Sequence, residues 1–388
     1  MIMPNENEII RRKRGRFEAV KILDTADISE GHREQMQIVT ADSKAQKKKY
    51  LAFRHALYRG DEAYVCTGEF VVENFLYQTT SFARACSVQP VMVLEEGIAA
   101  ECMLIHHSRL NLLQVAFFEA LPDQKAAVDM LLEYAKTEAG RIGVPEIIVG
   151  LNGHISCGVG ILTKEFHKIS FDSSYNKPYY ADYFAGMDRK EECTTYRGLV
   201  AESIKMLHVP NTGITVRPID LKHYEEEMEL FRSLCDRTLG TTHLYFPTDK
   251  GHFYELTKDM KAFLKPGNIL FAQYGKEYIG FLFWHPDFNQ ALRAGKQYNL
   301  IGIGRQFLFG QKRIDTVKIN AIGVLPEYQG TATVKLLDRM AQYLGTRFRF
   351  YETTFVWDNN EKSSRLNRHF AQSGYRKYAV YFDKVNHD

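Results

Sequence analysis

The chain has 388 residues, more than a single hydrophobic core usually holds, so two domains are expected. Its hydrophobic content of 45% and charged content of 25% are typical of a globular protein, and a net charge of +3 is too small to indicate a nucleic-acid or membrane partner. The 6 cysteines lack the spacing of a zinc site or a disulfide framework, so we expect no metal. With no apolar leader and no apolar run of membrane-spanning length, a cytoplasmic location is the prediction.

Residues 1–16 are polar and end in the basic cluster RRKRGR. No aromatic residues interleave with these charges, which favours a solvated, disordered basic arm over a nucleic-acid contact. From residue 17 onward the apolar pattern predicts regular elements. In the first half these are strands at 20–22, 91–94, 99–105, 112–118 and 146–149, with helices at 45–57 and 126–142.

The second half repeats this succession of elements. Strands are predicted at 214–216, 269–271, 278–284, 317–324 and 350–356, with helices at 224–235 and 328–344. Such a repeat predicts two similar α/β (α+β) units in tandem. Turn residues at 208–213 place the boundary between them there. We therefore predict domains at 17–207 and 208–388 after the arm.

The most informative stretch is VKINAIGVLPEYQGTATVKLLDRMAQYL at 317–344. It predicts a buried strand that Pro326 ends, a tight turn, and a helix whose first turn has small side chains. Backbone N–H groups at such a helix start have no intrahelical partner and attract phosphate. Small side chains let a diphosphate approach closely. The structural alternative is a helix that merely starts after a buried strand.

This stretch resembles the acyl-CoA-dependent N-acyltransferases of the GNAT superfamily. Their signature is a strand, a turn with proline, and then Gln/Arg-x-x-Gly-x-Gly/Ala at the start of a helix. Gln329 and Gly330 match this signature, whereas Ala332 stands where glycine is usual. The resemblance implies that the pyrophosphate of CoA lies on a loop made of Gln329, Gly330, Thr331, Ala332, Thr333 and Val334.

Two more segments, YNKPYY at 175–180 and WHPDFNQAL at 284–292, resemble a group of bacterial tandem GNAT-like proteins. They extend the likeness over most of residues 17–385. It implies two tandem GNAT-like domains, each with a mixed, splayed central sheet flanked by helices. The corresponding turn of the first half contains no glycine and carries Glu119 and Asp123, whose charges would repel a diphosphate. The first domain is therefore expected to be degenerate and to serve as structure or as a substrate wall.

The central strands of a GNAT sheet separate near the strand end that corresponds to Val324. The resemblance therefore implies that Ile322, Gly323 and Val324 bind the pantetheine and the thioester. The Val324 amide would polarise the acyl carbonyl, as an oxyanion hole does. Gly323 would suit a β-bulge, and the alternative is a glycine that relieves a packing clash.

The same resemblance suggests the remaining catalytic groups. Glu352, on the next strand, is the implied general base, with a solvent-facing carboxylate as the alternative. Phe370 occupies the position where many relatives place a tyrosine that acts as the general acid. Tyr378 and Tyr381 could take that role instead, or they form one face of a terminal strand. Asn360 matches an asparagine that contacts the cofactor, and a helix cap is its alternative.

These residues predict transfer of an acetyl group from acetyl-CoA to a primary amine of a small molecule or peptide. Direct attack in a ternary complex is expected, because no cysteine lies in the candidate site to take the acyl group first. A non-catalytic acyl-CoA-binding scaffold is the alternative. Aminoacyl transfer from charged tRNA is a third possibility, which the near-neutral charge disfavours. The acceptor, the acyl chain length and the formation of a homodimer are left open.

Overall fold

The computed structural model describes residues 36–296, 298, 300–371 and 373–385. The basic arm at 1–16 and the strand predicted at 20–22 lie outside the described residues. The first half contains β1 (Gln37–Thr40), α1 (Lys44–Leu57), α2 (Glu69–Leu76), α3 (Ser81–Ala85), β2 (Ser87–Leu94), β3 (Ile98–His106), β4 (Leu113–Ala120), α4 (Lys125–Ile142), β5 (Glu146–Val149), β6 (Ile161–Lys164), α5 (Tyr180–Tyr183), β7 (Arg189–Leu199) and α6 (Val200–Lys205).

The second half contains β8 (Ile214–Pro218), α7 (Tyr224–Leu239), α8 (Lys250–Thr257), β9 (Ile269–Tyr274), β10 (Glu277–Pro286), α9 (Leu300–Gly310), β11 (Thr316–Val324), α10 (Thr331–Leu344), β12 (Phe350–Thr353), β13 (Val356–Trp357), α11 (Glu361–Phe370) and β14 (Gly374–Lys384). Local sequence explains several boundaries. Ser43 and Gln46 form a capping box at the start of α1, and Gly143 ends α4 with a φ of 76°. Among these helices, none is both long and apolar enough to cross a bilayer.

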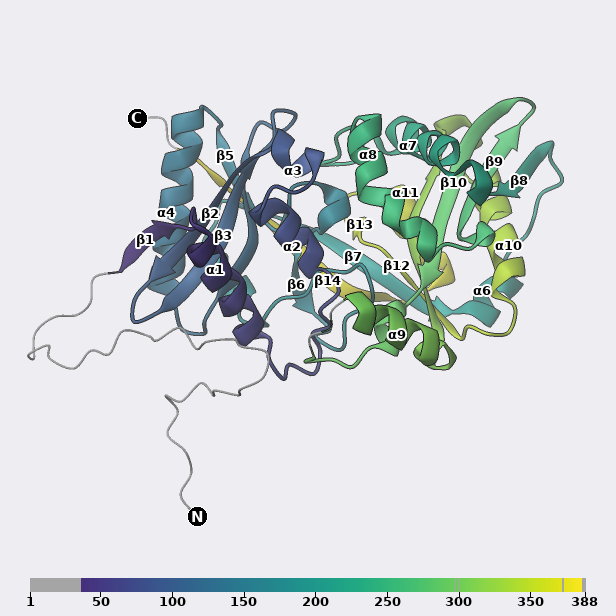
Figure 1. Ribbon diagram of the computed structural model, residues 1–388. Helices are drawn as coiled ribbons and strands as arrows, with labels where there is room; N and C mark the ends of the chain where they lie inside the picture. The colour runs from purple at the N-terminus through teal and green to yellow at the C-terminus, as the bar shows by residue number, and fades with distance from the viewer. Residues whose placement is uncertain (1–35, 297, 299, 372, 386–388) are drawn as a thin grey trace, which may run out of the picture.

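The two halves lie side by side and share one continuous sheet (Figure 1). Its strand order is β1-β2-β3-β4-β5-β14-β7-β12-β11-β10-β9-β8. The final strand, β14, therefore lies between β5 and β7 of the first half. Strand β7 pairs with β12 of the second half. Each half thus contributes a strand to the junction, and the boundary at residue 207 stays a prediction.

Each half contains one pair of parallel central strands that separate. Strands β4 and β5 are paired from Leu113 to Val115, although β4 continues to Ala120. Strands β11 and β12 are paired from Thr316 to Ile319, although β11 continues to Val324. Ladder pairing between the two strands ends at these points. In the first half the segment after β5 stays beside β4, since the Phe117 amide donates to the Asn152 side chain, whereas in the second half a gap opens between β11 and β12.

Helices cover both faces of the second half's sheet. Alternate residues of β9 and β10 pack on α10, including Leu270 and Leu282, while Phe271 and Phe281 pack on α7. This alternation is what period-two side-chain placement requires of a sheet buried on both faces. The gap between β11 and β12 therefore opens between two helical layers.

Candidate active site

The gap between β11 and β12 exposes backbone groups of β11. The Leu325 amide donates to the Ile279 carbonyl of β10 at 2.8 Å, so it points toward β10. Because successive amides of a strand alternate in direction, the amides of Val324 and Ile322 point the other way, where β12 has already diverged. The predicted oxyanion donor at Val324 thus faces a region with no paired strand among the described residues.

Gly323 does not form a bulge. The irregularity in β11 falls at Asn320, because Phe283 pairs with Ala321 and Trp284 pairs with Ile319. A Cβ atom on Gly323 would lie 2.1 Å from Thr238 Oγ1 of α7. Glycine is therefore required for close helix packing, which confirms the structural alternative, and the bulge reorients Asn320 instead.

The turn before α10 has the geometry expected of an anion-binding helix start. Gly330 has a φ of 87° and open space around its α-carbon. The Gln329 amide donates to the Pro326 carbonyl, and the Val334 amide donates to the Gly330 carbonyl. The amides between them have no hydrogen-bond partner in the described part of the chain; these are Gly330, Thr331, Ala332 and Thr333. Vacant amides at a helix N-terminus suit a diphosphate.

A cavity of about 710 Å³ runs through the gap between the strands. On one side it is lined by residues of α10 and α11, including Met340, Ala341 and Ser363. On the other side it is lined by Phe231 of α7 and by residues of the first half. The cavity therefore reaches both faces of the sheet at the gap.

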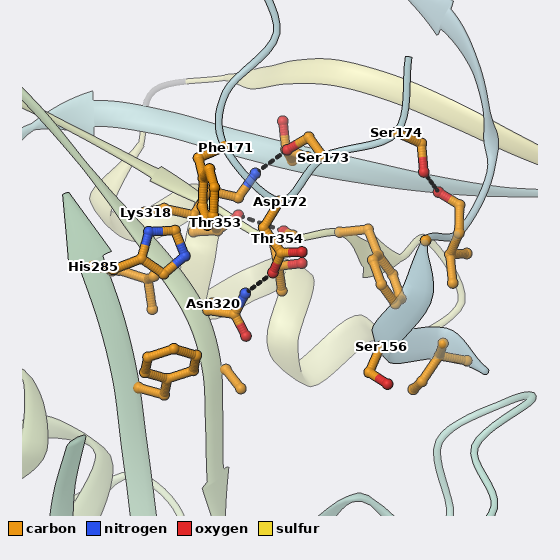
Figure 2. A pocket seen from close by; sticks show the side chains of 18 of the residues that line it. Ser156, Phe171, Asp172, Ser173, Ser174, His285, Lys318, Asn320, Thr353 and Thr354 are labelled. Atoms are coloured by element: carbon orange, nitrogen blue, oxygen red, sulfur yellow. Dashed lines mark hydrogen bonds between the residues drawn. The ribbon is translucent and has the colours of Figure 1, made fainter. Parts of the chain in front are cut away.

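Polar side chains gather where β11 borders this cavity (Figure 2). Lys318, buried on β11, donates to the Ser173 hydroxyl. The side-chain amide of Asn320 donates to the Asp172 carboxylate. Desolvation by the surrounding protein raises the pKa of Asp172, and the Lys318 charge and the Asn320 hydrogen bond only partly offset this rise. The Asp172 side chain nevertheless opens toward the cavity, and its backbone has a φ of 60°. A strained residue with a perturbed carboxyl is a functional candidate.

His285 of β10 lies beside this group (Figure 2). Its Nδ1 atom lies 3.0 Å from the Pro286 carbonyl, which requires the proton to be on Nδ1. Burial, reinforced by the Lys318 charge, lowers the pKa of His285 to about 4. The ring is therefore neutral at pH 7, with Nε2 as a hydrogen-bond acceptor.

Glu352 is 3% exposed, so the alternative of a solvent-facing carboxylate is wrong. Its Oε1 atom accepts from Arg376 at 2.7 Å and from the Ser170 hydroxyl at 2.8 Å, and Oε2 accepts from Arg376 at 2.9 Å. Lys318 Nζ lies 3.6 Å away. Burial opposes ionisation, but Lys318, Arg376 and Ser170 outweigh it and lower the pKa of Glu352. A carboxylate held in this way is a poor proton acceptor.

Tyr378, Phe370 and Asn360 border the cavity, whereas Glu352, Tyr381, Val324 and the turn at 329–334 are not among its lining residues. Tyr378 is 2% exposed, and burial raises the pKa of its hydroxyl. Ser173 lies close enough to offset part of this rise, yet the hydroxyl has no hydrogen bond of normal geometry within the described residues. Phe370 lines the cavity. Asn360 caps α11 by accepting from the Ser363 amide at 3.1 Å, which confirms the structural alternative, and it also lines the cavity.

The equivalent turn of the first half is filled by tyrosines. The Tyr180 hydroxyl accepts from the Ala120 amide, and the Tyr183 hydroxyl accepts from the Gln124 amide. Glu119 does not lie at the helix start as expected. It is buried, accepts from Tyr58 and Tyr180, and forms an ion pair with Arg54. In the first half, backbone amides of the equivalent turn are therefore already hydrogen-bonded to protein groups.

Sequence reasoning did not single out several groups of this site, namely Asp172, Ser173, His285, Lys318, Asn320 and Arg376. The sequence signal that could have indicated this group is Lys318, a lysine within an apolar strand pattern. Among the described residues, no group of three or more His, Cys, Asp or Glu side chains is placed to hold a metal ion.

The tandem GNAT protein from the clavulanic acid biosynthesis pathway matches 91% of this chain and 100% of its own, with a TM-score of 0.54 and 10% identity. The chain has the tandem GNAT fold. The likeness confirms the predicted fold class. A probable N-acyltransferase from Enterococcus faecalis matches 90% of this chain and 73% of its own, with a TM-score of 0.53 and 10% identity.

Comparison of sequences gives a more limited relationship. No family model matches this tandem GNAT chain. Among curated proteins, the bacterial ceramide synthase of Caulobacter vibrioides is 22% identical over 181 residues. The match covers 44% of this chain and 46% of that protein, so it spans less than half of the relative's length.

Proposed function

We propose that this protein is an acyl-CoA-dependent N-acyltransferase that acylates a primary amine by direct attack in a ternary complex, with acetyl-CoA as the simplest donor. The proposal rests on two sets of backbone amides that have no hydrogen-bond partner among the described residues. One set lies at the start of α10, and the other lies on the edge of β11 that β12 leaves free. The relative named a ceramide synthase supports amide formation, since a ceramide is an amide.

The residues present fit the cofactor. Thr331, Ala332 and Thr333 would hold the diphosphate with their amides, and Ile322 and Val324 would hold the pantetheine and the thioester carbonyl. Acyl-CoA supplies an activated acyl group with a thiolate leaving group. Cys157 and Cys235 also line the cavity, but burial raises the pKa of both thiols, which opposes a covalent intermediate on cysteine.

We assign the general base to Asp172 instead of Glu352. Asp172 opens to the cavity, whereas both oxygens of Glu352 accept hydrogen bonds from Arg376. Asp172 would take the proton that the attacking amine loses, and Asn320 would hold the carboxylate in place. Tyr378 is retained as the acid that protonates the leaving thiolate, because the residue borders the cavity and its buried hydroxyl has no hydrogen bond of normal geometry among the described residues.

The test is to mix the purified full chain with acetyl-CoA and a panel of primary amines, and to measure free thiol. Thiol release that depends on both enzyme and amine is expected. If no amine releases thiol although CoA raises the melting temperature, the chain is a non-catalytic acyl-CoA binder. A shift of charged tRNA in a gel, without thiol release, would instead favour aminoacyl transfer.

A further inference from the structure

The cavity continues from the gap between β11 and β12 into a chamber between the two halves. First-half walls come from α2 and α3, including Val71, Phe75 and Phe82. Second-half walls come from α7, α8 and the turn after α8, including Phe231, Leu256 and Met260. These helices face one another across the junction (Figure 1). The chamber therefore exists only when both halves are present.

The junction of α3 and α8 closes the chamber on one side. The Ser81 amide and hydroxyl of α3 both donate to Glu255 of α8. Phe82 stacks on Phe246 with 6.3 Å between ring centroids. Phe70 of α2 also lines the cavity and is 57% exposed, so the chamber reaches the surface beside α2.

Polarity changes along the chamber. Among the described residues that line the cavity, those with a formal charge are Arg54, Asp172 and Lys318. Asp172 and Lys318 lie at the gap, and Arg54 forms ion pairs with Glu69 and Glu119. Most of the remaining wall is aromatic or aliphatic, as where the rings of Phe75 and Phe117 lie with their centroids 5.5 Å apart, and neutral polar side chains such as Asn152 are set among them. This lining favours a ligand with a polar group at the gap and apolar groups along most of its length.

We propose that the chamber binds an unbranched hydrocarbon chain of the substrate, whose reacting group lies at the gap. The inference rests on the proposed function and deepens it, because it makes one substrate of the acyl transfer an amphiphile. The chain belongs either to the amine or to the acyl-CoA, since both reactive groups meet at the gap. Each methylene that enters the chamber should improve affinity about threefold to fourfold.

The experiment has two arms and uses the full-length chain below the micelle-forming concentration of each substrate. In one arm, acetyl-CoA is combined with butylamine, octylamine or dodecylamine. In the other arm, butylamine is combined with acetyl-CoA, octanoyl-CoA or palmitoyl-CoA. We expect KM to fall steeply with chain length in one arm, and that arm identifies the substrate that carries the chain.

Matched variants test whether the chamber causes this dependence. Val71→Trp places an indole in the chamber, whereas Glu73→Trp places it on the exposed side of the same helix. The ratio of short-chain to long-chain KM should collapse toward one in V71W and stay at the wild-type value in E73W. Leu256→Trp repeats the test from the second half, in case V71W does not fold.

The outcomes separate the two proposals. Equal KM values for all chain lengths, with thiol released from butylamine, overturn the chamber proposal and leave the acyltransferase standing. If no thiol appears with any pair, but dodecylamine or palmitoyl-CoA raises the melting temperature of the wild type and not of L256W, the chamber stands and the acyltransferase fails. A chain-length dependence that V71W and L256W both retain also overturns the chamber.

Discussion

At the scale of single residues, the site contains two carboxylates with opposite properties. Glu352 is fixed in a buried ion pair with Arg376, and its pKa is lowered. Asp172 opens to the cavity, and its pKa is raised. When two carboxyl groups of one site have environments that separate their pKa values, each is suited to a different task. We therefore predict a structural role for Glu352 and a chemical role for Asp172.

The structural role of Glu352 is tested by stability. Glu352→Gln removes a charge and leaves Arg376 buried without its counterion, so the free energy of unfolding should fall by about 3–5 kcal/mol. Because the folded-state pKa of Glu352 is lowered, its contribution is present above the unfolded pKa and is lost as pH falls through the folded pKa. Urea denaturation at several pH values measures both effects.

The control for this prediction is the double variant Glu352→Gln with Arg376→Met. It removes both charges and should recover part of the lost stability, since no unpaired guanidinium remains. An E352Q protein of wild-type stability with a greatly reduced kcat would contradict the structural role. That result would restore Glu352 as the general base.

The chemical role of Asp172 is tested by Asp172→Asn. Asparagine tolerates the same left-handed backbone, so the melting temperature should stay within a few degrees of wild type. The amide cannot accept a proton, and kcat should fall about 10²-fold to 10⁴-fold. The wild-type kcat/KM should decrease as pH falls through the raised pKa of Asp172, and this limb should vanish in D172N. Unchanged pH profiles would exclude Asp172.

At the scale of elements, α10 provides a test in which stability and binding move in opposite directions. A negative charge at a helix start is favourable with the helix dipole but repels a diphosphate on the same amides. Thr331→Glu should therefore raise stability by about 0.3–1 kcal/mol and weaken CoA binding about tenfold or more. Thr331→Gln is the uncharged control, and calorimetric titration gives the affinities. Equal affinities in both variants would place the diphosphate elsewhere.

The sequence predicts those elements whose pattern is contained in a short run of neighbouring residues. The strand ending at Val324 and the helix through Leu344 follow from apolar periodicity and from Pro326, and the structure confirms both within a few residues. The Asp172 and Ser173 loop has no periodic pattern and reaches β11 only through tertiary packing. Arg376 is identified as the partner of Glu352 only by strand pairing across the junction. Such contacts depend on topology, which one sequence does not encode locally.

At the scale of the whole molecule, the exchange of strands joins the two halves. β14 is hydrogen-bonded to β5 on one edge and to β7 on the other, and β7 in turn pairs with β12. Removing either half leaves the other with an unpaired strand edge and exposed apolar surface. The candidate site follows the same arrangement, since Tyr378 and Arg376 lie on β14, whereas Asp172 comes from the first half.

This arrangement predicts that the halves do not fold separately, although the sequence repeat suggests two domains. Fragments 1–207 and 208–388 should each be insoluble or unfolded when expressed alone, as judged by circular dichroism, because each lacks the strand that the other supplies. Co-expression should yield a soluble complex, which serves as the control, and the intact chain should unfold in one transition. A folded fragment 208–388 that binds CoA as a monomer would contradict this prediction. It would mean that β14 can return to its own half, and that the two units are independent domains in contact.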